Sequence, residues 1–146
     1  GEAHARAERS ELWQWRQTSQ GRLAELILLD QVSRQLYRND ARAFASDTMA
    51  LALSQEAIAQ GADKELDIHG RLFVYMPFQH AESLVIQEES VKLFKNLGDD
   101  SFLPYAQEHH DVVARFGRFP LRNKALGRVS TAEEIEYIES RGDKAY

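Results

Sequence analysis

Apolar residues that recur every three or four positions limit the fold of this chain more than any other feature, because that spacing places them on one face of an α-helix. Together with capping residues, glycine and proline, the spacing predicts helices over residues 18–37, 43–60, 65–75, 80–97 and 102–116, with shorter helices at 2–9 and 130–140. No stretch alternates apolar and polar residues for long enough to indicate a strand. The sequence therefore predicts an all-α protein built from antiparallel helix pairs.

Capping residues and helix breakers set the expected helix boundaries. The expected N-terminal caps are Thr18, Ser101 and a capping box formed by Ser130 and Glu133. The expected stops are Gly61, Gly98 and Gly117, together with Pro77 after the helix over residues 65–75.

Composition bounds the class of protein. At 146 residues and 43% hydrophobic, the chain suits one domain over residues 1–146 with a real core. It has no cysteine, signal-peptide pattern or membrane-length apolar run, so we expect a cytoplasmic protein without a membrane partner. A formal net charge of -5 argues against nucleic acid as a partner. The oligomeric state does not follow from the sequence.

Polar residues interrupt the core-facing rows of four predicted helices. The rows are Leu23, Ile27, Asp30, Arg34 and Tyr37; Phe44, Asp47, Leu51, Ser54 and Ile58; His80, Leu84, Gln87, Val91 and Phe94; and Phe102, Ala106, His109, Val113 and Phe116. A buried charge without a partner costs several kcal/mol, so these groups either satisfy one another or face a wet cavity. Asp30 and Arg34 lie one turn apart, and a structural pair within their helix is the simpler interpretation of them.

The stretch RFGRFPLRNKALGR, residues 115–128, holds five cations and no acid. Glycine and proline disfavour a continuous helix there, so the guanidinium groups can converge on one carboxylate or phosphate. Alternatively, they cap helix C-termini and pair with acids elsewhere in the chain. The sequence supports both interpretations equally.

Two histidines are candidate proton carriers, His80 and His109, although a histidine at a helix start is as often a packing or capping residue. The candidate ligand-binding residues are Arg118, Arg122, Asn123, Arg128, Arg34 and Asp30. No metal-ligand spacing and no glycine-rich phosphate loop is present, so we expect neither a metal nor a cofactor.

Four sequence motifs, taken together, resemble those of a known family. They are LLDQ-x-x-R-x-x-Y-R at residues 28–38, A-x-x-x-D at 43–47, R-x-F-x-Y-M-P-x-x-H-x-E at 71–82, and H-x-x-x-x-x-R-F-G-R-F-P-x-R-N-x-x-L-G-R at 109–128. The chain resembles the bacterial domain-of-unknown-function family nine-two-four across nearly all of residues 18–140. The resemblance implies a tetratricopeptide-like array of helical hairpins, a right-handed α-α superhelix, and assigns no activity.

Two departures from the family pattern stand out. Family members usually carry a further N-terminal segment with a Trp-Phe pair, so we expect that this chain lacks an opening helical segment. Leu121 stands where histidine is usual, which removes a candidate for proton transfer from that position.

Two hypotheses for function follow. In the first, a polar pocket binds a small carboxylate or phosphate through Arg118, Arg122 and Arg128, with His80 or His109 available for acid/base chemistry. In the second, the helical array is an interaction module whose groove holds an acidic or C-terminal peptide. An enclosed pocket favours the first and a wide open groove favours the second.

Overall fold

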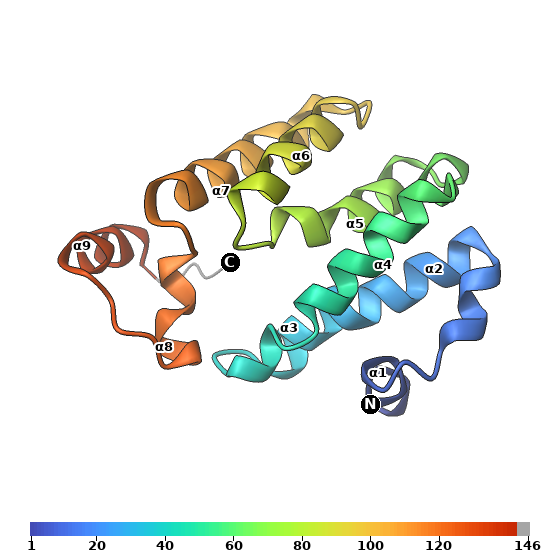
Figure 1. Ribbon diagram of the computed structural model, residues 1–146, viewed down its shortest axis with the longest axis horizontal. Coiled ribbons are helices and arrows are strands. Elements are labelled where there is room, and N and C mark those ends of the chain that lie inside the picture. The colour runs from blue at the N-terminus through green and yellow to red at the C-terminus, as the bar shows by residue number, and fades with distance from the viewer. Residues whose placement is uncertain (143–146) are drawn as a thin grey trace.

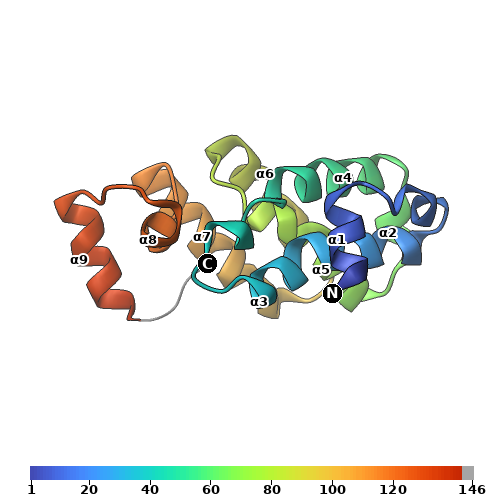
Figure 2. The same cartoon turned by 90° about the horizontal axis from the view of Figure 1, so that it is seen from below.

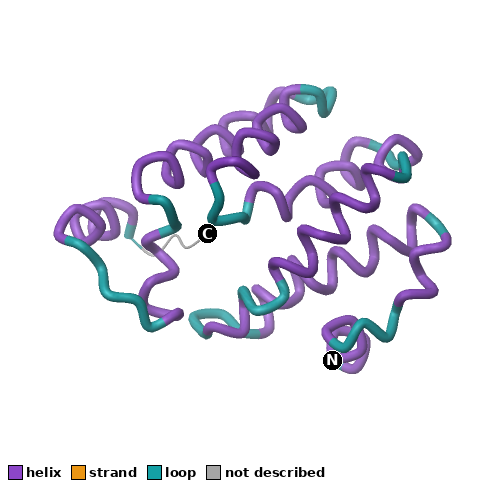
Figure 3. Tube along the Cα trace, in the orientation of Figure 1, coloured by secondary structure: helices purple, strands orange, loops and turns teal. Residues whose placement is uncertain are grey.

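The computed structural model describes residues 1–142, which form helices joined by short turns and contain no strand (Figure 1, Figure 3). The α-helices are α1 (Glu2–Glu8), α2 (Ser19–Leu26), α3 (Ser33–Leu36), α4 (Asp47–Ala59), α5 (Ile68–Gln79), α6 (Leu84–Lys95), α7 (Leu103–Phe116), α8 (Asn123–Leu126) and α9 (Ala132–Arg141). Short 3₁₀ turns occur at Trp13–Gln17, Ala41–Ala43, Ala62–Glu65, Asp100–Phe102 and Pro120–Arg122. The all-α prediction is confirmed. No helix in the described range has the length and apolar character needed to cross a membrane.

The helix predicted over residues 18–37 is continuous but changes type in its middle. Thr18 caps it by accepting a hydrogen bond from the Gly21 amide at 2.9 Å. Between α2 and α3, Ile27–Val32 form a π-helical segment, which accommodates an extra residue in the helical turn. Asp30 lies in this segment and is 1% exposed. The π-helical turn therefore carries an acidic side chain into the interior of the protein.

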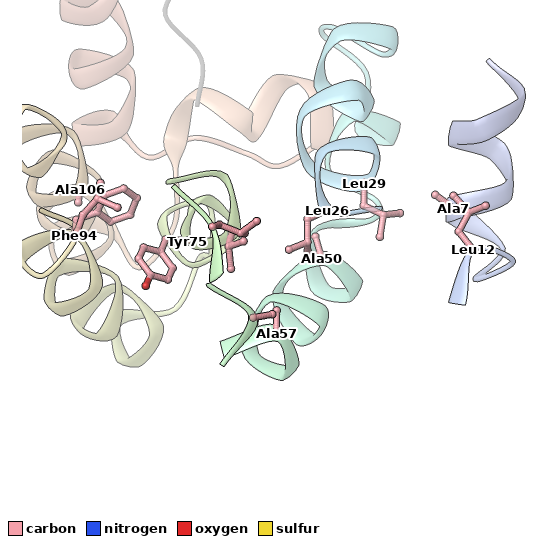
Figure 4. Close-up of a cluster of buried hydrophobic side chains, with 13 residues drawn as sticks. Ala7, Leu12, Leu26, Leu29, Ala50, Ala57, Tyr75, Phe94 and Ala106 are labelled. Carbon is pink, nitrogen blue, oxygen red and sulfur yellow. The ribbon is translucent and has the colours of Figure 1, made fainter. Parts of the chain in front are cut away.

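The helices pack in the order in which they follow one another. α4 packs on α2 and α5, α5 on α6, and α6 on α7, while α8 and α9 lie together at one end of the elongated molecule (Figure 2). The main core draws on α1, α2, α4, α5, α6 and α7 (Figure 4). A second, smaller core of Val112, Val113 and Phe119 supports the turn that leaves α7.

Two predicted boundaries around residue 80 are wrong. Pro77 does not stop its helix but lies inside the last turn of α5. At this position proline removes only one main-chain hydrogen bond. The helix continues past it, since the His80 amide still donates to the Met76 carbonyl at 3.0 Å. His80 consequently ends α5 instead of opening the next helix. Ser83 caps α6, which begins at Leu84.

Other helix starts are shifted. α4 begins at Asp47, four residues later than predicted, and Asp67 caps α5, which begins at Ile68. The capping box of α9 is formed by Thr131 and Glu134, one residue beyond the predicted pair, because T-x-x-E follows S-x-x-E directly in the sequence.

The cap before α7 differs from the predicted one, whereas two helix ends agree with the prediction. Asp99, and not Ser101, caps the 3₁₀ turn that leads into α7. Gly61 and Gly117 follow α4 and α7 with φ of 73° and 75°, as predicted for left-handed helix ends.

Candidate functional site

A cavity of about 390 Å³ lies where the start of α4, the turn from α5 to α6, and the segment Pro120–Leu126 meet. In Figure 1 the start of α4 and the turn from α5 to α6 lie on the side of the helical body that faces α8. The lining of the cavity combines apolar and small polar residues with four ionisable side chains. The ionisable residues are Asp47, His80, Glu82 and Arg122.

His80 and Asp30 form a buried pair at the wall of this cavity. The Nδ1 atom of His80 lies 2.7 Å from Oδ1 of Asp30, and because an ionised carboxylate can only accept, Nδ1 is the donor. Burial lowers the pKa of His80 below its usual value, and this effect outweighs the opposing charge of Asp30. Burial would raise the pKa of Asp30, but its interactions with His80 and Arg34 hold it below its usual value. The pair is therefore a neutral imidazole beside an ionised carboxylate.

Arg34 joins this pair to α4. Its Nη1 atom donates to Oδ1 of Asp30 at 3.0 Å and to Oδ1 of Asp47 at 2.8 Å, while Nη2 donates to Oδ2 of Asp47 at 2.9 Å. The predicted pairing of Asp30 with Arg34 is thus present in the structure, but it is one part of a larger network. Bidentate geometry of this kind fixes the orientation of both partners.

Arg122 is 3% exposed and carries the buried positive charge nearest the cavity. Its guanidinium lies 4.5 Å from the ring centroids of both Phe44 and Phe119, a cation–π arrangement on two sides. Nη2 donates to the His80 carbonyl at 2.9 Å, and Nη1 lies 3.5 Å from Oδ2 of Asp47. Burial, followed by the charge of Arg34, lowers the pKa of Arg122 to about 10.

Glu82 and Arg128 close the other side of the cavity. Arg128 donates through Nη1 and Nη2 to the two Glu82 oxygens at 3.0 and 2.9 Å, and the Phe119 amide donates to Oε2 at 2.8 Å. Burial would raise the pKa of Glu82, but these hydrogen bonds hold it below its usual value. Asn123 accepts from Nε of Arg128 at 2.9 Å, which orients the arginine.

The structure brings most of the predicted site residues together. Those in or directly behind the cavity wall are Asp30, Arg34, His80, Arg122, Asn123 and Arg128. His109 lies one layer further away, with its ring centroid 6.3 Å from that of His80 and its Nδ1 donating to the Tyr105 carbonyl at 2.7 Å.

The three arginines predicted to grip one anion do not converge on one point. Arg118 donates to both oxygens of Glu134, at 2.9 and 2.8 Å, and to the Val129 carbonyl. Arg122 faces Asp47 and Arg128 faces Glu82. The turn between α7 and α8 directs the three side chains toward different carboxylates, so Arg118 stabilises the start of α9 and is not part of the cavity.

Two acidic residues of the cavity were missed as site residues, although each left a signal in the sequence. Asp47 occupies a core-facing position in the predicted row of α4, and Glu82 stands two residues after His80 within a family motif. Phe44 and Phe119 also belong to the site, because they enclose the Arg122 guanidinium.

Residues 1–142 match the family model DUF924, described as a bacterial protein of unknown function. The chain belongs to this family. The solved structure of a protein of unknown function from Agrobacterium tumefaciens shares 41% sequence identity and superposes with a TM-score of 0.91, covering 95% of this chain and 78% of that one. A comparison with curated proteins finds no match. All four motifs that indicated the family contribute to the cavity or to the network behind its wall. The motif at 28–38 supplies Asp30 and Arg34, the motif at 43–47 supplies Asp47, the motif at 71–82 supplies His80 and Glu82, and the motif at 109–128 supplies Arg122 and Arg128.

Proposed function

We propose that the protein binds a small anionic molecule, a carboxylate or a phosphate, in the cavity between Arg122 and His80, and that His80 serves there as a proton acceptor. The observation that carries the proposal is the placement of His80. Its Nδ1 is engaged by Asp30, while its Nε2 makes no hydrogen bond to any residue within the described part of the chain, and the side chain lines the cavity. A neutral imidazole with its second nitrogen available is the form required of a general base.

Arg122 supplies the charge for the anion. The two aromatic rings hold its guanidinium in one plane without neutralising it, and burial strengthens its interaction with a ligand charge. The lowered pKa of Arg122 supports this assignment, because it indicates a cation that a further negative charge would stabilise.

Proton transfer to His80 would be stabilised from behind. If Nε2 takes a proton from the ligand or from a water molecule, the resulting imidazolium lies 2.7 Å from the ionised Asp30, which offsets the new charge. Arg34 fixes the position of Asp30, as a supporting residue of a catalytic site does. Hydrolysis and elimination are the two reaction classes that such a base beside a clamped anion can support.

The anion-binding part of the proposal predicts a thermal shift. Saturating sodium phosphate or sodium acetate should raise the melting temperature above that in sodium chloride of equal ionic strength, since a ligand at 100 times its dissociation constant stabilises the native state by about 2.7 kcal/mol. In Arg122→Lys most of the rise should disappear, because lysine cannot reproduce the planar guanidinium.

Lys95→Ala is the matched control, since Lys95 is an exposed cation on α6 whose loss should leave the shift unchanged. Each variant is compared with its own melting temperature in chloride, so that a change in intrinsic stability does not enter. Equal shifts in all three proteins, or none beyond that in chloride, would contradict the proposal.

A second candidate function rests on a different surface. A groove of about 800 Å³ lies between Arg38–Asn39, the segment Pro120–Arg128 and α9, and it is lined by Arg38, Lys124 and Arg128 with no acidic residue among its described lining. Our second proposal is that the helices form a tetratricopeptide-like, right-handed superhelix whose groove holds an acidic peptide. The volume of the groove, about twice that of the cavity beside His80, and the positive charge of its described lining favour a chain over a small molecule.

The peptide proposal predicts a charge-specific loss of binding. A fluorescein-labelled hexaglutamate with a free C-terminus should bind in a salt-dependent manner, and Arg38→Glu with Lys124→Glu should reduce its affinity about tenfold or more, because two attractions become repulsions. Lys95→Glu with Lys92→Glu, which makes the same charge change on α6, should leave binding nearly unaltered. Equal losses in the two double variants would indicate a response to net charge and would exclude the groove.

A further inference from the structure

The cavity wall offers hydrogen-bond acceptors next to its cation, and this limits which anions can bind. Nη1 of Arg122 and Oδ2 of Asp47 lie 3.5 Å apart, which places a donor beside an acceptor. The Asp47 side chain is 18% exposed and the Glu82 side chain is 23% exposed, so neither side chain is fully enclosed by the protein. A carboxylate has about four acceptor positions, and Arg34 occupies two on Asp47. A ligand bearing only an anionic group would place its charge close to these two like charges.

Within the described part of the chain, oppositely charged groups alternate along this cluster. Three guanidinium groups, those of Arg34, Arg122 and Arg128, contact three carboxylates, and His80 is neutral. The carboxylates are Asp30, Asp47 and Glu82. Because each charged group here lies beside one of opposite sign, a ligand that carries both an anionic and a cationic group fits this arrangement better than a simple anion.

Most of the remaining lining is apolar, with Thr48 and Ser83 as the polar exceptions, and this indicates the character of the rest of the ligand. Phe44, Leu51, Pro77 and Leu126 contribute hydrocarbon surface to the same cavity. Its volume of about 390 Å³ accommodates a molecule of roughly ten non-hydrogen atoms and lies near the lower end of small-molecule sites.

We infer that the ligand is a zwitterionic 2-amino acid with an apolar side chain, its carboxylate on Arg122 and its ammonium on Asp47 and Glu82. The carboxylate and the amine of such a molecule sit on one carbon, which matches a donor and an acceptor that are immediate neighbours on the wall. The inference rests on the proposed function, because it assigns the anionic group to the same arginine. It adds the cationic half of the ligand and the apolar side chain.

Titration calorimetry with four related compounds tests the assignment. L-Leucine should bind about tenfold or more tightly than 4-methylpentanoate, which lacks the amine, and than 3-methylbutylamine, which lacks the carboxylate, because each truncation leaves one buried charge without its partner. 2-Hydroxy-4-methylpentanoate has a neutral donor in place of the ammonium, and its affinity should lie between that of leucine and those of the two truncated compounds.

Asp47→Asn distinguishes a specific effect from misfolding, because the affinities for two compounds should change in opposite directions. Removing this negative charge should weaken leucine and strengthen 4-methylpentanoate, so that the preference between the two compounds shrinks or reverses. Lys95→Ala should keep the order found in the unaltered protein.

The outcomes separate this inference from the proposed function. If phosphate or acetate binds in an Arg122-dependent manner but leucine binds no better than 4-methylpentanoate, the amino-acid assignment is overturned while anion binding stands. If none of the small anions and none of the four compounds binds, both are overturned. If the small anions bind in an Arg122-dependent manner and leucine binds more tightly than 4-methylpentanoate in a manner that depends on Asp47, both are supported.

Discussion

Replacing Asp30 with alanine is expected to lower the free energy of unfolding by about 3–5 kcal/mol, because the change breaks a buried ion pair and removes the acceptor of two buried hydrogen bonds. Asp30 is 1% exposed and accepts hydrogen bonds from both His80 and Arg34. Urea unfolding at pH 7 measures the loss, with Glu88→Ala on the exposed face of α6 as the control, for which a change within about 0.5 kcal/mol is expected.

The double variant distinguishes a network from an isolated pair. If Asp30 and Arg34 interacted only with each other, replacing both with apolar residues would recover much of the loss. Arg34 also donates two hydrogen bonds to Asp47. The double variant therefore removes these two bonds as well as the acceptor of His80 Nδ1, and we expect no recovery. A loss below about 1 kcal/mol in Asp30→Ala would contradict the assignment of Asp30 as an ionised buried group.

Acidification is expected to destabilise the protein before its carboxylates titrate, through His109. Burial lowers the pKa of His109 to about 4, compared with about 6.5 in the unfolded chain. Between these two values the unfolded state binds a proton that the folded state does not, so stability falls as the pH falls from about 6.5 toward 4. The contribution of His109 at pH 5 is about 2 kcal/mol relative to pH 8. His80 acts in the same direction, because burial lowers its pKa also.

Comparison of two histidine variants isolates this effect. Urea unfolding at pH 8 and pH 5 should show a difference that is smaller by about 2 kcal/mol in His109→Gln than in the unaltered protein. The same change at the neighbouring residue, His110→Gln, should leave the difference as it is, because His110 lies on the other face of α7 and bonds to Asp111 near the surface. An unaltered pH dependence in His109→Gln would show that His109 does not titrate below its usual range.

Much of this architecture could be predicted because helical periodicity and caps are local properties of the sequence. The row of Asp30 and Arg34 indicated a polar interior position, and the structure places both against His80. Local rules failed at Pro77, where a helix supported by packing on both sides tolerates a residue that would end an isolated one.

The partners of the basic stretch could not be predicted in the same way. Arg128 meets Glu82 across 46 positions and Arg118 meets Glu134 across 16, and both pairings depend on how the turn after α7 directs the following segment. Five cations without an acid suggested convergence, but charge composition does not specify direction. The interpretation that the arginines pair with acids elsewhere in the chain is the one that the structure bears out for Arg118 and Arg128, while the predicted convergence on one point is absent. Arg122 lines a cavity by itself.

Because of the π-helical turn at Ile27–Val32, a single deletion could disrupt the cavity while leaving the helical fold intact. The extra residue sets the angle between the apolar face of α2, which packs on α4 and α5, and the polar face that carries Asp30 and Arg34. Loss of one codon within this turn would restore a regular helix, keep Leu23 and Leu26 in the core, and rotate Asp30 away from His80 by about 100°. Relatives that have undergone such a deletion would retain the helical fold and lose the buried histidine–aspartate pair in a single genetic event.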